Sequence, residues 1–165
     1  MNIAVILAGG SGTRLGNDIP KQFLKVAGKK VLEHTIEVFE NAKNIDEICI
    51  VSRIDCINDV ESIVVNNGYL KVKKILAGGK ERYDSSLAAI HAYPNGNHNL
   101  LFHDAVRPLL TERIINDCLS ALEKYNAVDV AIKTTDTIIQ VDEQKCITAI
   151  PNRSELRNGQ TPQCY

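Results

Sequence analysis

The sequence predicts an α/β fold in which a mostly parallel, twisted sheet carries helices on both faces. Two observations predict this class. Short apolar runs recur along the chain, and the segments between them are long enough for the crossover helices that parallel neighbouring strands require. At 165 residues, the chain is long enough to bury one core and too short for two well-formed ones, so we expect a single domain over residues 1–165.

Strands are predicted where the apolar runs are rich in Val, Ile and Leu. These runs are Ile3–Leu7, Glu47–Val51, Val72–Leu76, Asn99–His103 and Ala127–Lys133. Between them, apolar residues recur with a helical period. The predicted helices are Val31–Asn41, Ile57–Asn67, Tyr83–His91 and Glu112–Tyr125. Thr111 directly precedes the last helix and is a good N-cap candidate. This alternation of strands and helices predicts a helix layer on each face of the sheet.

The pattern changes after Lys133 from apolar runs to alternating residues. Thr137–Val141 and Cys146–Ile150 alternate in this way and are separated by the polar stretch Asp142–Lys145, which predicts a β-hairpin. We expect a protruding arm over about residues 134–152. Because a two-stranded ribbon is barely stable alone, the arm should pack on its own domain or reach a partner subunit.

The charge balance excludes a general attraction to polyanions. The chain has 19 basic and 20 acidic residues and a net charge of −1, so we expect no nucleic-acid partner and no membrane surface. No apolar run approaches the roughly 20 residues needed to span a bilayer. Met1 leads directly into a strand rather than a signal core, which predicts a cytoplasmic protein.

The cysteines show no metal-binding spacing. There are 5 of them and no C-x-x-C pair. Cys49 lies in a predicted strand and Cys118 in a predicted helix, so we expect both to be reduced, buried side chains, although a thiol nucleophile stays an alternative.

The position of the strands predicts where a ligand binds. In a mostly parallel sheet, ligands bind outside the carboxyl ends of the strands, near the point where the strand order reverses. This rule selects the loops Gly9–Lys21, Ala77–Asp84 and His103–Pro108. All three carry glycine or charged residues, so we expect the functional site where they meet.

The first of these loops has the composition of a phosphate site. Leu7–Lys21 reads LAGGSGTRLGNDIPK, and its glycines let backbone N–H groups approach an anion, while Arg14 and Lys21 supply positive charge. It is not a Walker A loop, because Thr13 follows Gly12 where a Lys is needed. It is not a dinucleotide fingerprint either, because the third glycine comes late, at Gly16. The alternative is an ordinary glycine-rich turn between a strand and a helix.

The other two loops carry a carboxylate and a second glycine-rich helix entry. Asp104 ends a predicted strand and is a plausible Mg²⁺ ligand, since Mg²⁺ needs only one or two carboxylates beside substrate phosphates. The alternative is that Asp104 pairs with Arg107. Gly78–Ser86 could contact a base or a sugar, or could be a helix start capped by Asp84 or Ser85. His103 is expected to be a packed histidine rather than a metal ligand.

These groups suit phosphoryl or nucleotidyl transfer better than hydride or acyl transfer. Two glycine-rich loops, one Asp and an Arg/Lys pair are present, and no nucleophile is evident. Phosphoryl chemistry depends mainly on positioning and charge neutralisation, which these residues supply.

The motifs resemble those of the cytidylyltransferases that make CDP-activated methylerythritol or ribitol. The matching segments, which span the chain, are Leu7–Arg14 with Pro20–Gln22, Gly78–Ser85, His103–Pro108, Asp136–Thr137 and Gln160–Gln163. The resemblance implies a three-layer, Rossmann-like nucleotidyltransferase fold with a hairpin arm. It implies transfer of a cytidylyl group from CTP to a polyol phosphate, with Mg²⁺ bridging the phosphates.

Two branches of this family are open. One acts on 2-C-methyl-D-erythritol 4-phosphate in isoprenoid synthesis, and the other on D-ribitol 5-phosphate in teichoic acid or capsule synthesis. Val106, Thr135–Ile138, Ile150–Arg153 and Gly159 look like the ribitol branch, which we favour.

The resemblance also implies residue roles. Arg14 and Lys21 would be catalytic, holding the triphosphate and stabilising the pentacoordinate phosphorus, and Asp104 would hold the metal. The nucleotide would be bound by Leu7, Ala8, Gly9, Gly10, Ser11, Gly12, Thr13, Gly79, Arg82 and Ser85, the last three facing cytosine. The polyol phosphate would be bound by Arg107, Thr137 and Arg153, the latter two offered across a homodimer by the arm.

Family members have further elements beyond the position of Tyr165, including an Asp for the metal and a Lys for the substrate. A chain without them is expected to have a weaker, single-carboxylate metal site. A non-catalytic CTP-binding unit is therefore a second alternative to the enzyme.

Overall fold

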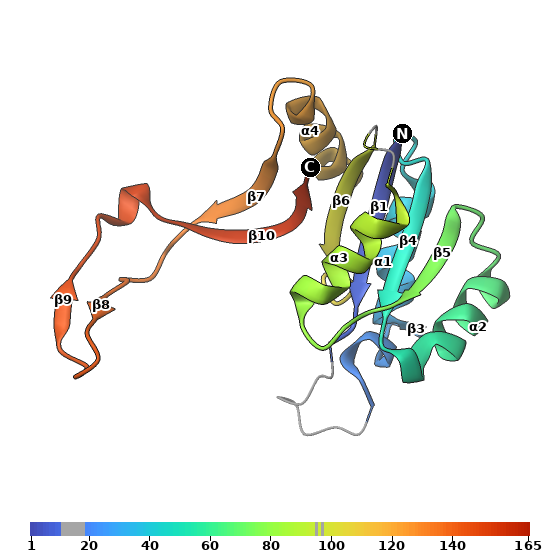
Figure 1. Cartoon of the computed structure of the whole chain (residues 1–165), viewed down its shortest axis with the longest axis horizontal. Helices are drawn as coiled ribbons and strands as arrows, with labels where there is room; N and C mark the ends of the chain where they lie inside the picture. The colour runs from blue at the N-terminus through green and yellow to red at the C-terminus, as the bar shows by residue number, and fades with distance from the viewer. Residues whose placement is uncertain (11–18, 95, 97) are drawn as a thin grey trace.

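The computed structural model describes residues 1–10, 19–94, 96 and 98–165. In Figure 1, a body of strands and helices carries a long two-stranded extension that projects from one side of the sheet. The predicted site residues of the first loop at positions 11–14 lie outside the described residues.

The body is built on one twisted, mostly parallel sheet. Its strands are β1 (Asn2–Ala8), β4 (Glu47–Ser52), β5 (Val72–Ala77), β6 (Asn99–Asp104), β7 (Val128–Lys133) and β10 (Arg157–Cys164). Their order is β5-β4-β1-β6-β10-β7, in which β5, β4, β1 and β6 are mutually parallel and β10 is antiparallel to both of its neighbours. The chain moves outward from β1 through β4 to β5 and then returns to the other side of β1 with β6, so the strand order reverses beside β1.

The register aligns the carboxyl ends of the central strands. Leu7 of β1 is opposite Val51 of β4 on one side and opposite Asp104 of β6 on the other. Because these strands are parallel, the loops that follow them leave the sheet at one edge.

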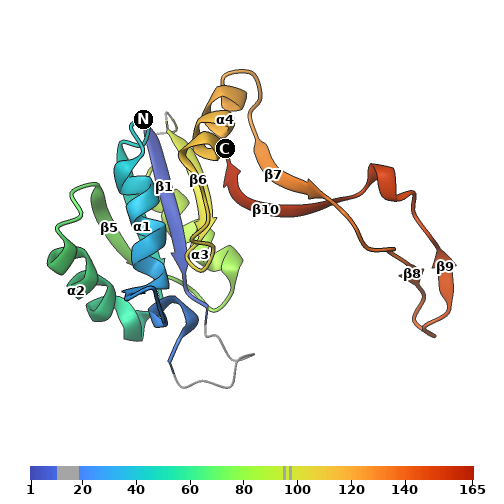
Figure 2. The same cartoon turned by 180° about the vertical axis from the view of Figure 1, so that it is seen from behind.

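Helices cover both faces, as the sequence predicts. They are α1 (Val31–Asn41), α2 (Ile57–Asn67), α3 (Arg82–Ala92) and α4 (Glu112–Leu122). Buried residues of α1, α2 and α4 form one apolar cluster with β1, β4 and β6, whereas Ala89 of α3 belongs to a second cluster on the opposite face. Figure 1 shows α3 in front of the sheet, and Figure 2 shows α1 in front after the molecule is turned.

The predicted details of these elements are largely confirmed. Helices α1 and α2 have the predicted bounds, and Thr111 caps α4, its Oγ1 accepting a hydrogen bond from the Ile114 N–H at 3.5 Å. Cys49 and Cys118 are buried free thiols. None of the helices among the described residues has the length and apolar character needed to cross a membrane.

Strand β10 was not predicted, because its sequence argues against a central strand. It contains Gly159 and Pro162 among polar side chains, and these residues disfavour an interior strand. Contacts with both neighbours nevertheless place β10 between β6 and β7, with a register shift between Gly159 and Gln163. The sheet is therefore mixed at this end.

A small hairpin before α1 was also not predicted. It pairs β2 (Lys25–Val26) with β3 (Lys29–Lys30). Its turn places Ala27 and Gly28 at positive φ, a conformation that suits two-residue hairpin turns.

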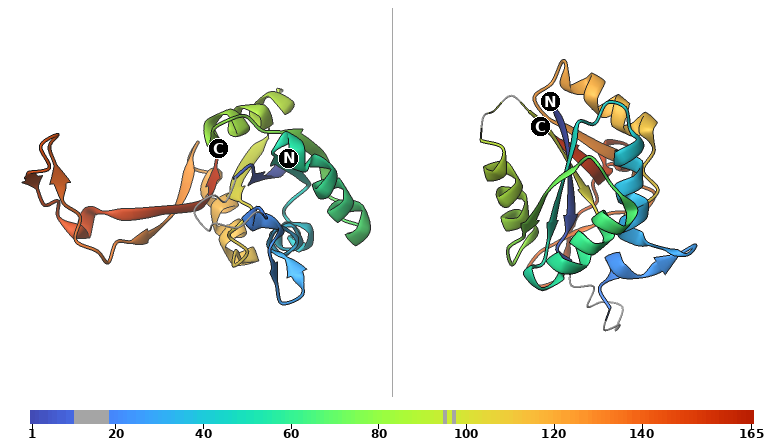
Figure 3. Two further views of the ribbon diagram at one scale, coloured as in Figure 1. Left: turned by 90° about the horizontal axis from the view of Figure 1, so that it is seen from below. Right: turned by 90° about the vertical axis from the view of Figure 1, so that its right-hand side faces the viewer.

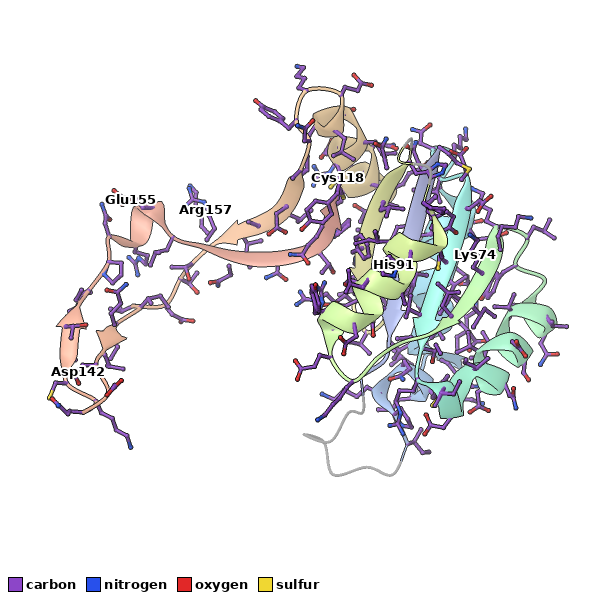
Figure 4. The ribbon with its side chains drawn as sticks, viewed as in Figure 1. Lys74, His91, Cys118, Asp142, Glu155 and Arg157 are labelled. Carbon is purple, nitrogen blue, oxygen red and sulfur yellow. The ribbon has the colours of Figure 1, made fainter. Side chains whose placement is uncertain are left out.

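The predicted arm is present, with shorter paired strands. Strands β8 (Gln140–Val141) and β9 (Ile147–Ala149) pair antiparallel, and a single-turn 3₁₀ helix, η4 (Arg153–Glu155), connects β9 to β10. Asp142 lies at the tip, where its carboxylate accepts a hydrogen bond from the Cys146 N–H at 2.8 Å (Figure 4). The left view of Figure 3 shows the arm extended away from the body.

Candidate functional site

A cavity of about 770 Å³ lies where the carboxyl ends of β1, β4, β5 and β6 meet. The loops that the sequence selected all contribute to it. Its lining consists of Leu7, Ala8, Gly9, Gly10, Lys21, Gln22, Arg53, Gly79, Lys80, Glu81, Arg82, Ser85, Asp104, Ala105, Val106 and Arg107. This volume is in the range of small-molecule sites, and the lining is rich in basic side chains.

The first glycine-rich loop is held at both of its described ends. The Nε2 of Gln22 donates a hydrogen bond to the Ala8 carbonyl oxygen at 2.9 Å, and Gln22 is 1% exposed. This bond fixes the 3₁₀ turn η2 (Lys21–Phe23) beside the end of β1, which brings Lys21 to the cavity. The predicted residues Ser11, Gly12, Thr13 and Arg14 lie outside the described residues.

The second glycine-rich loop packs closely against the start of α3. The Gly78 N–H donates to the Ser52 carbonyl oxygen at 2.7 Å, which ties the loop to the end of β4. A Cβ on Gly79 would lie 2.2 Å from the Cβ of Asp84, a distance that side chains do not reach. Glycine is therefore required for this close approach.

The alternative of a capped helix start is also correct for this loop. Asp84 accepts a hydrogen bond from the Glu81 N–H at 2.9 Å and forms a capping box. Ser85 donates to the Glu81 carbonyl oxygen at 3.3 Å, and it is 4% exposed. The capping rigidifies the loop, and it leaves Gly79 and Ser85 on the wall of the cavity.

Asp104 is the centre of an ion-pair network. Its Oδ2 accepts from Arg107 Nε at 3.0 Å, which is the pairing that the sequence offered as an alternative to a metal site. Its Oδ1 lies 3.5 Å from Arg82 Nε, a contact that was not predicted. Arg107 also donates to the side chain of Gln160 on β10. Arg82 and Arg107 therefore meet at one carboxylate, although they come from separate elements.

Buried polar contacts hold the turn that carries Asp104. His103 is 1% exposed, and its Nε2 donates to the Arg107 carbonyl oxygen at 3.0 Å. Burial lowers the pKa of this imidazole, which favours its neutral form. Thr35 of α1 donates to the Ala105 carbonyl oxygen at 2.8 Å. The expectation of a packed histidine is thus confirmed.

Several residues at the cavity were not predicted as site residues. Arg53 follows β4 directly and pairs with Asp55, with 2.9 Å between Nε and Oδ1. The rule that selects the carboxyl ends of strands would have found Arg53, had it been applied to β4 as well. The other such residues are Gln22, Lys80, Glu81, Ala105 and Val106, all in or next to the selected loops.

The cavity does not include two predicted substrate residues. Thr137 and Arg153 lie on the arm, and Arg153 donates to the Thr135 carbonyl oxygen at 3.1 Å. Because the arm extends away from the body, one chain does not bring these residues to its own cavity (Figure 1).

The oxygen donors at the cavity fit a cation that is held mainly by the phosphates of a bound molecule and only partly by the protein. Among the described residues, no group of three or more His, Cys, Asp or Glu side chains could hold a metal ion. Asp104 is one of two carboxylates in the lining, the other being Glu81, and it lies beside basic groups that suit phosphates. Mg²⁺ bound to a polyphosphate needs one or two protein carboxylates, so Asp104 fits this kind of site.

Comparison with known proteins gives one consistent family. The family model for IspD, 2-C-methyl-D-erythritol 4-phosphate cytidylyltransferase, matches residues 2–165. The chain is 51% identical over 99% of its length to the bifunctional ribulose 5-phosphate reductase/CDP-ribitol pyrophosphorylase Bcs1 of Haemophilus influenzae, and it spans 35% of that protein. It is 40% identical over 98% of its length to the 2-C-methyl-D-erythritol 4-phosphate cytidylyltransferase of Thermobifida fusca, and it spans 68% of that protein.

A solved structure agrees with this result. The crystal structure of 4-diphosphocytidyl-2C-methyl-D-erythritol synthase from Anaerococcus prevotii superimposes with a TM-score of 0.84 at 32% identity, and the match covers 99% of this chain and 69% of that one. The predicted nucleotidyltransferase-like fold is therefore confirmed.

Proposed function

The chain belongs to the IspD family of cytidylyltransferases, and we propose that it transfers a cytidylyl group from CTP to D-ribitol 5-phosphate, giving CDP-ribitol and pyrophosphate. The observation that carries the proposal is the cavity in which two glycine-rich loops, Lys21 and Asp104 meet. The choice of ribitol is supported by the 51% identity to a relative named as a CDP-ribitol pyrophosphorylase.

The proposed reaction needs positioning and positive charge. A phosphate oxygen of the polyol phosphate attacks the α-phosphorus of CTP, a new P–O bond forms, and the bond to the β-phosphate breaks with release of pyrophosphate. Lys21 at the mouth of the first loop would neutralise charge that develops on the phosphates. Arg14, which lies outside the described residues, is proposed to act with it.

The remaining cavity residues are proposed to bind and orient the nucleotide. Gly79 and Ser85 would face cytosine, because the close packing against α3 leaves backbone groups at the wall. Asp104 would hold Mg²⁺, which supplies charge neutralisation on the phosphates when bound. Arg107 would contact the polyol phosphate.

We propose that the arm completes the site of a second copy. It exposes apolar side chains that find no cover within this chain's described residues, and a ribbon of this kind is barely stable alone. The exposed residues are Ile138, Ile139, Val141, Ile147 and Ile150. A homodimer would cover them and could bring Thr137 and Arg153 to the partner's cavity, in a cytoplasmic enzyme whose substrates are soluble metabolites.

A pyrophosphate-release assay tests the reaction. Release is expected only with CTP, Mg²⁺ and ribitol 5-phosphate together, and UTP or ATP should not replace CTP. Lys21→Ala should lower the rate by at least about 100-fold, the scale of one lost electrostatic group. Lys25→Ala is the matched control, because Lys25 is exposed on β2 and does not line the cavity. Near-normal activity of Lys21→Ala would refute the role of this loop.

The methylerythritol branch is the second candidate, supported by the family model and by the Thermobifida relative. Faster release with 2-C-methyl-D-erythritol 4-phosphate than with ribitol 5-phosphate would select it. The third candidate is a CTP-binding unit without catalysis. This third candidate would be favoured if calorimetry shows that the folded protein binds CTP and if neither polyol phosphate is turned over.

A further inference from the structure

We propose that Arg82 and Arg107 act as exchangeable counter-ions of Asp104: they neutralise it in the free protein, and they pass to the phosphates when a divalent cation takes the carboxylate. The inference rests on the proposed function, which supplies the polyphosphate and the metal. It gives Arg82 a different role from the cytosine contact that the resemblance implies, and it gives Arg107 a different role from the contact with the polyol phosphate.

The geometry shows that both oxygens of Asp104 are already engaged. Oδ1 lies 3.5 Å from Arg82 Nε, and Oδ2 lies 3.0 Å from Arg107 Nε. The two arginines approach from different directions in the chain, one from the first turn of α3 and the other from the turn after β6. A cation that binds this carboxylate must therefore compete with two guanidinium groups.

Electrostatic repulsion separates two states of Asp104, one paired with the two arginines and one bound to a divalent cation. A divalent cation at Asp104 would lie within a few ångströms of two positive charges and would be repelled by both. If the guanidinium groups turn away, they need other anionic partners. The phosphates of a nucleotide supply them, because guanidinium forms paired hydrogen bonds with phosphate oxygens.

The exposure of the three side chains makes the exchange inexpensive. The side chains of Arg82 and Arg107 are 50% and 44% exposed, and that of Asp104 is 26% exposed. All three line the same cavity. Ion pairs at such positions contribute little, so replacing them by a metal and a phosphate does not disturb the core.

Asp104 thereby favours metal-bound over metal-free polyphosphate. Without a cation, the carboxylate occupies both arginines and also repels the phosphates. With a cation, it attracts the metal, and the arginines become available to the anion. Arg107 further contacts Gln160, so the exchange also reaches β10, the strand that leads back from the arm.

The first experiment measures binding of inorganic tripolyphosphate by calorimetry in excess EDTA. Asp104→Asn frees both arginines, and it should bind the anion about fivefold more tightly than the wild type. Glu81→Gln is the control, because it removes the same charge from the cavity lining without touching the ion pairs of Asp104. The gain in tripolyphosphate affinity should be smaller in the double variant Asp104→Asn/Arg82→Gln. A gain no larger than that of Glu81→Gln overturns the proposal.

The second experiment measures binding of Mn²⁺ alone by electron paramagnetic resonance. Arg82→Gln removes one competitor for the carboxylate and should bind Mn²⁺ about threefold more tightly than the wild type, a change on the scale of one exposed ion pair. Arg53→Gln removes a cavity arginine that pairs with Asp55 instead, so its effect should be smaller. Equal Mn²⁺ affinity of Arg82→Gln and the wild type overturns the proposal even if Asp104→Asn fails to fold.

These tests separate the exchange from the proposed reaction. Neither uses CTP or a polyol phosphate, so an intact exchange without pyrophosphate release would count against the cytidylyltransferase activity alone. Release of pyrophosphate without the two affinity changes would count against the exchange alone.

Discussion

Replacing Gly79 by alanine tests how the second glycine-rich loop forms the cavity. The new Cβ would lie 2.2 Å from Asp84 Cβ and 2.9 Å from Asp84 Oδ2. Asp84 cannot rotate away without giving up the hydrogen bond that it accepts from the Glu81 N–H at 2.9 Å. The loop itself must therefore shift away from α3.

The cost can be worked from this geometry. Overpacking costs about 1–3 kcal/mol, and loss of an N-terminal cap costs about 1 kcal/mol. We expect the free energy of unfolding to fall by about 2 kcal/mol, which lowers Tm by about 4–8 °C in a chain of this size. If the loop relaxes only when no nucleotide is bound, the same energy appears as a loss of CTP affinity of about 30-fold.

Thermal denaturation and calorimetric CTP titration measure these two quantities on the same variant. Gly9→Ala is the matched control, since its Cβ would meet Ser85 Oγ at 3.5 Å, an ordinary van der Waals contact. It should keep the wild-type Tm. A Gly79→Ala variant that keeps both the Tm and the CTP affinity of the wild type would show that the close contact with Asp84 does not shape the cavity.

Three further changes have defined outcomes. Gln22→Ala leaves the buried Ala8 carbonyl oxygen without its partner and should lower the free energy of unfolding by about 1–3 kcal/mol in urea titrations. Thr111→Ala removes the cap of α4 and should cost about 1 kcal/mol in the same assay, whereas Thr111→Ser should not. Burial raises the pKa of Cys49 from 9.0 to about 12, so its contribution to stability is complete below pH 9 and is lost as the pH rises toward 12. The stability of Cys49→Ala should therefore fall less steeply above pH 9; an unchanged slope would contradict this.

The location of the candidate site could be predicted from the sequence, but most of its side-chain contacts could not. Asp104, Gly79 and Lys21 were expected at the carboxyl edge of the sheet, and all three line the cavity. The pairing of Asp104 with Arg107 was one of two stated alternatives, because the two residues are three positions apart on one turn. The contact of Arg82 with Asp104 was not predicted, since it depends on how α3 docks beside the end of β6.

The helices, the parallel strands and the sheet edge that carries the cavity could be predicted without the structure. These follow from local periodicity, and parallel strands necessarily bring their carboxyl ends to one edge. The three-dimensional structure was needed to show that the polar segment Arg157–Cys164 enters the sheet and that Gln160 contacts Arg107. Such contacts join residues far apart in the chain, and their stability comes from neighbours that no local pattern specifies.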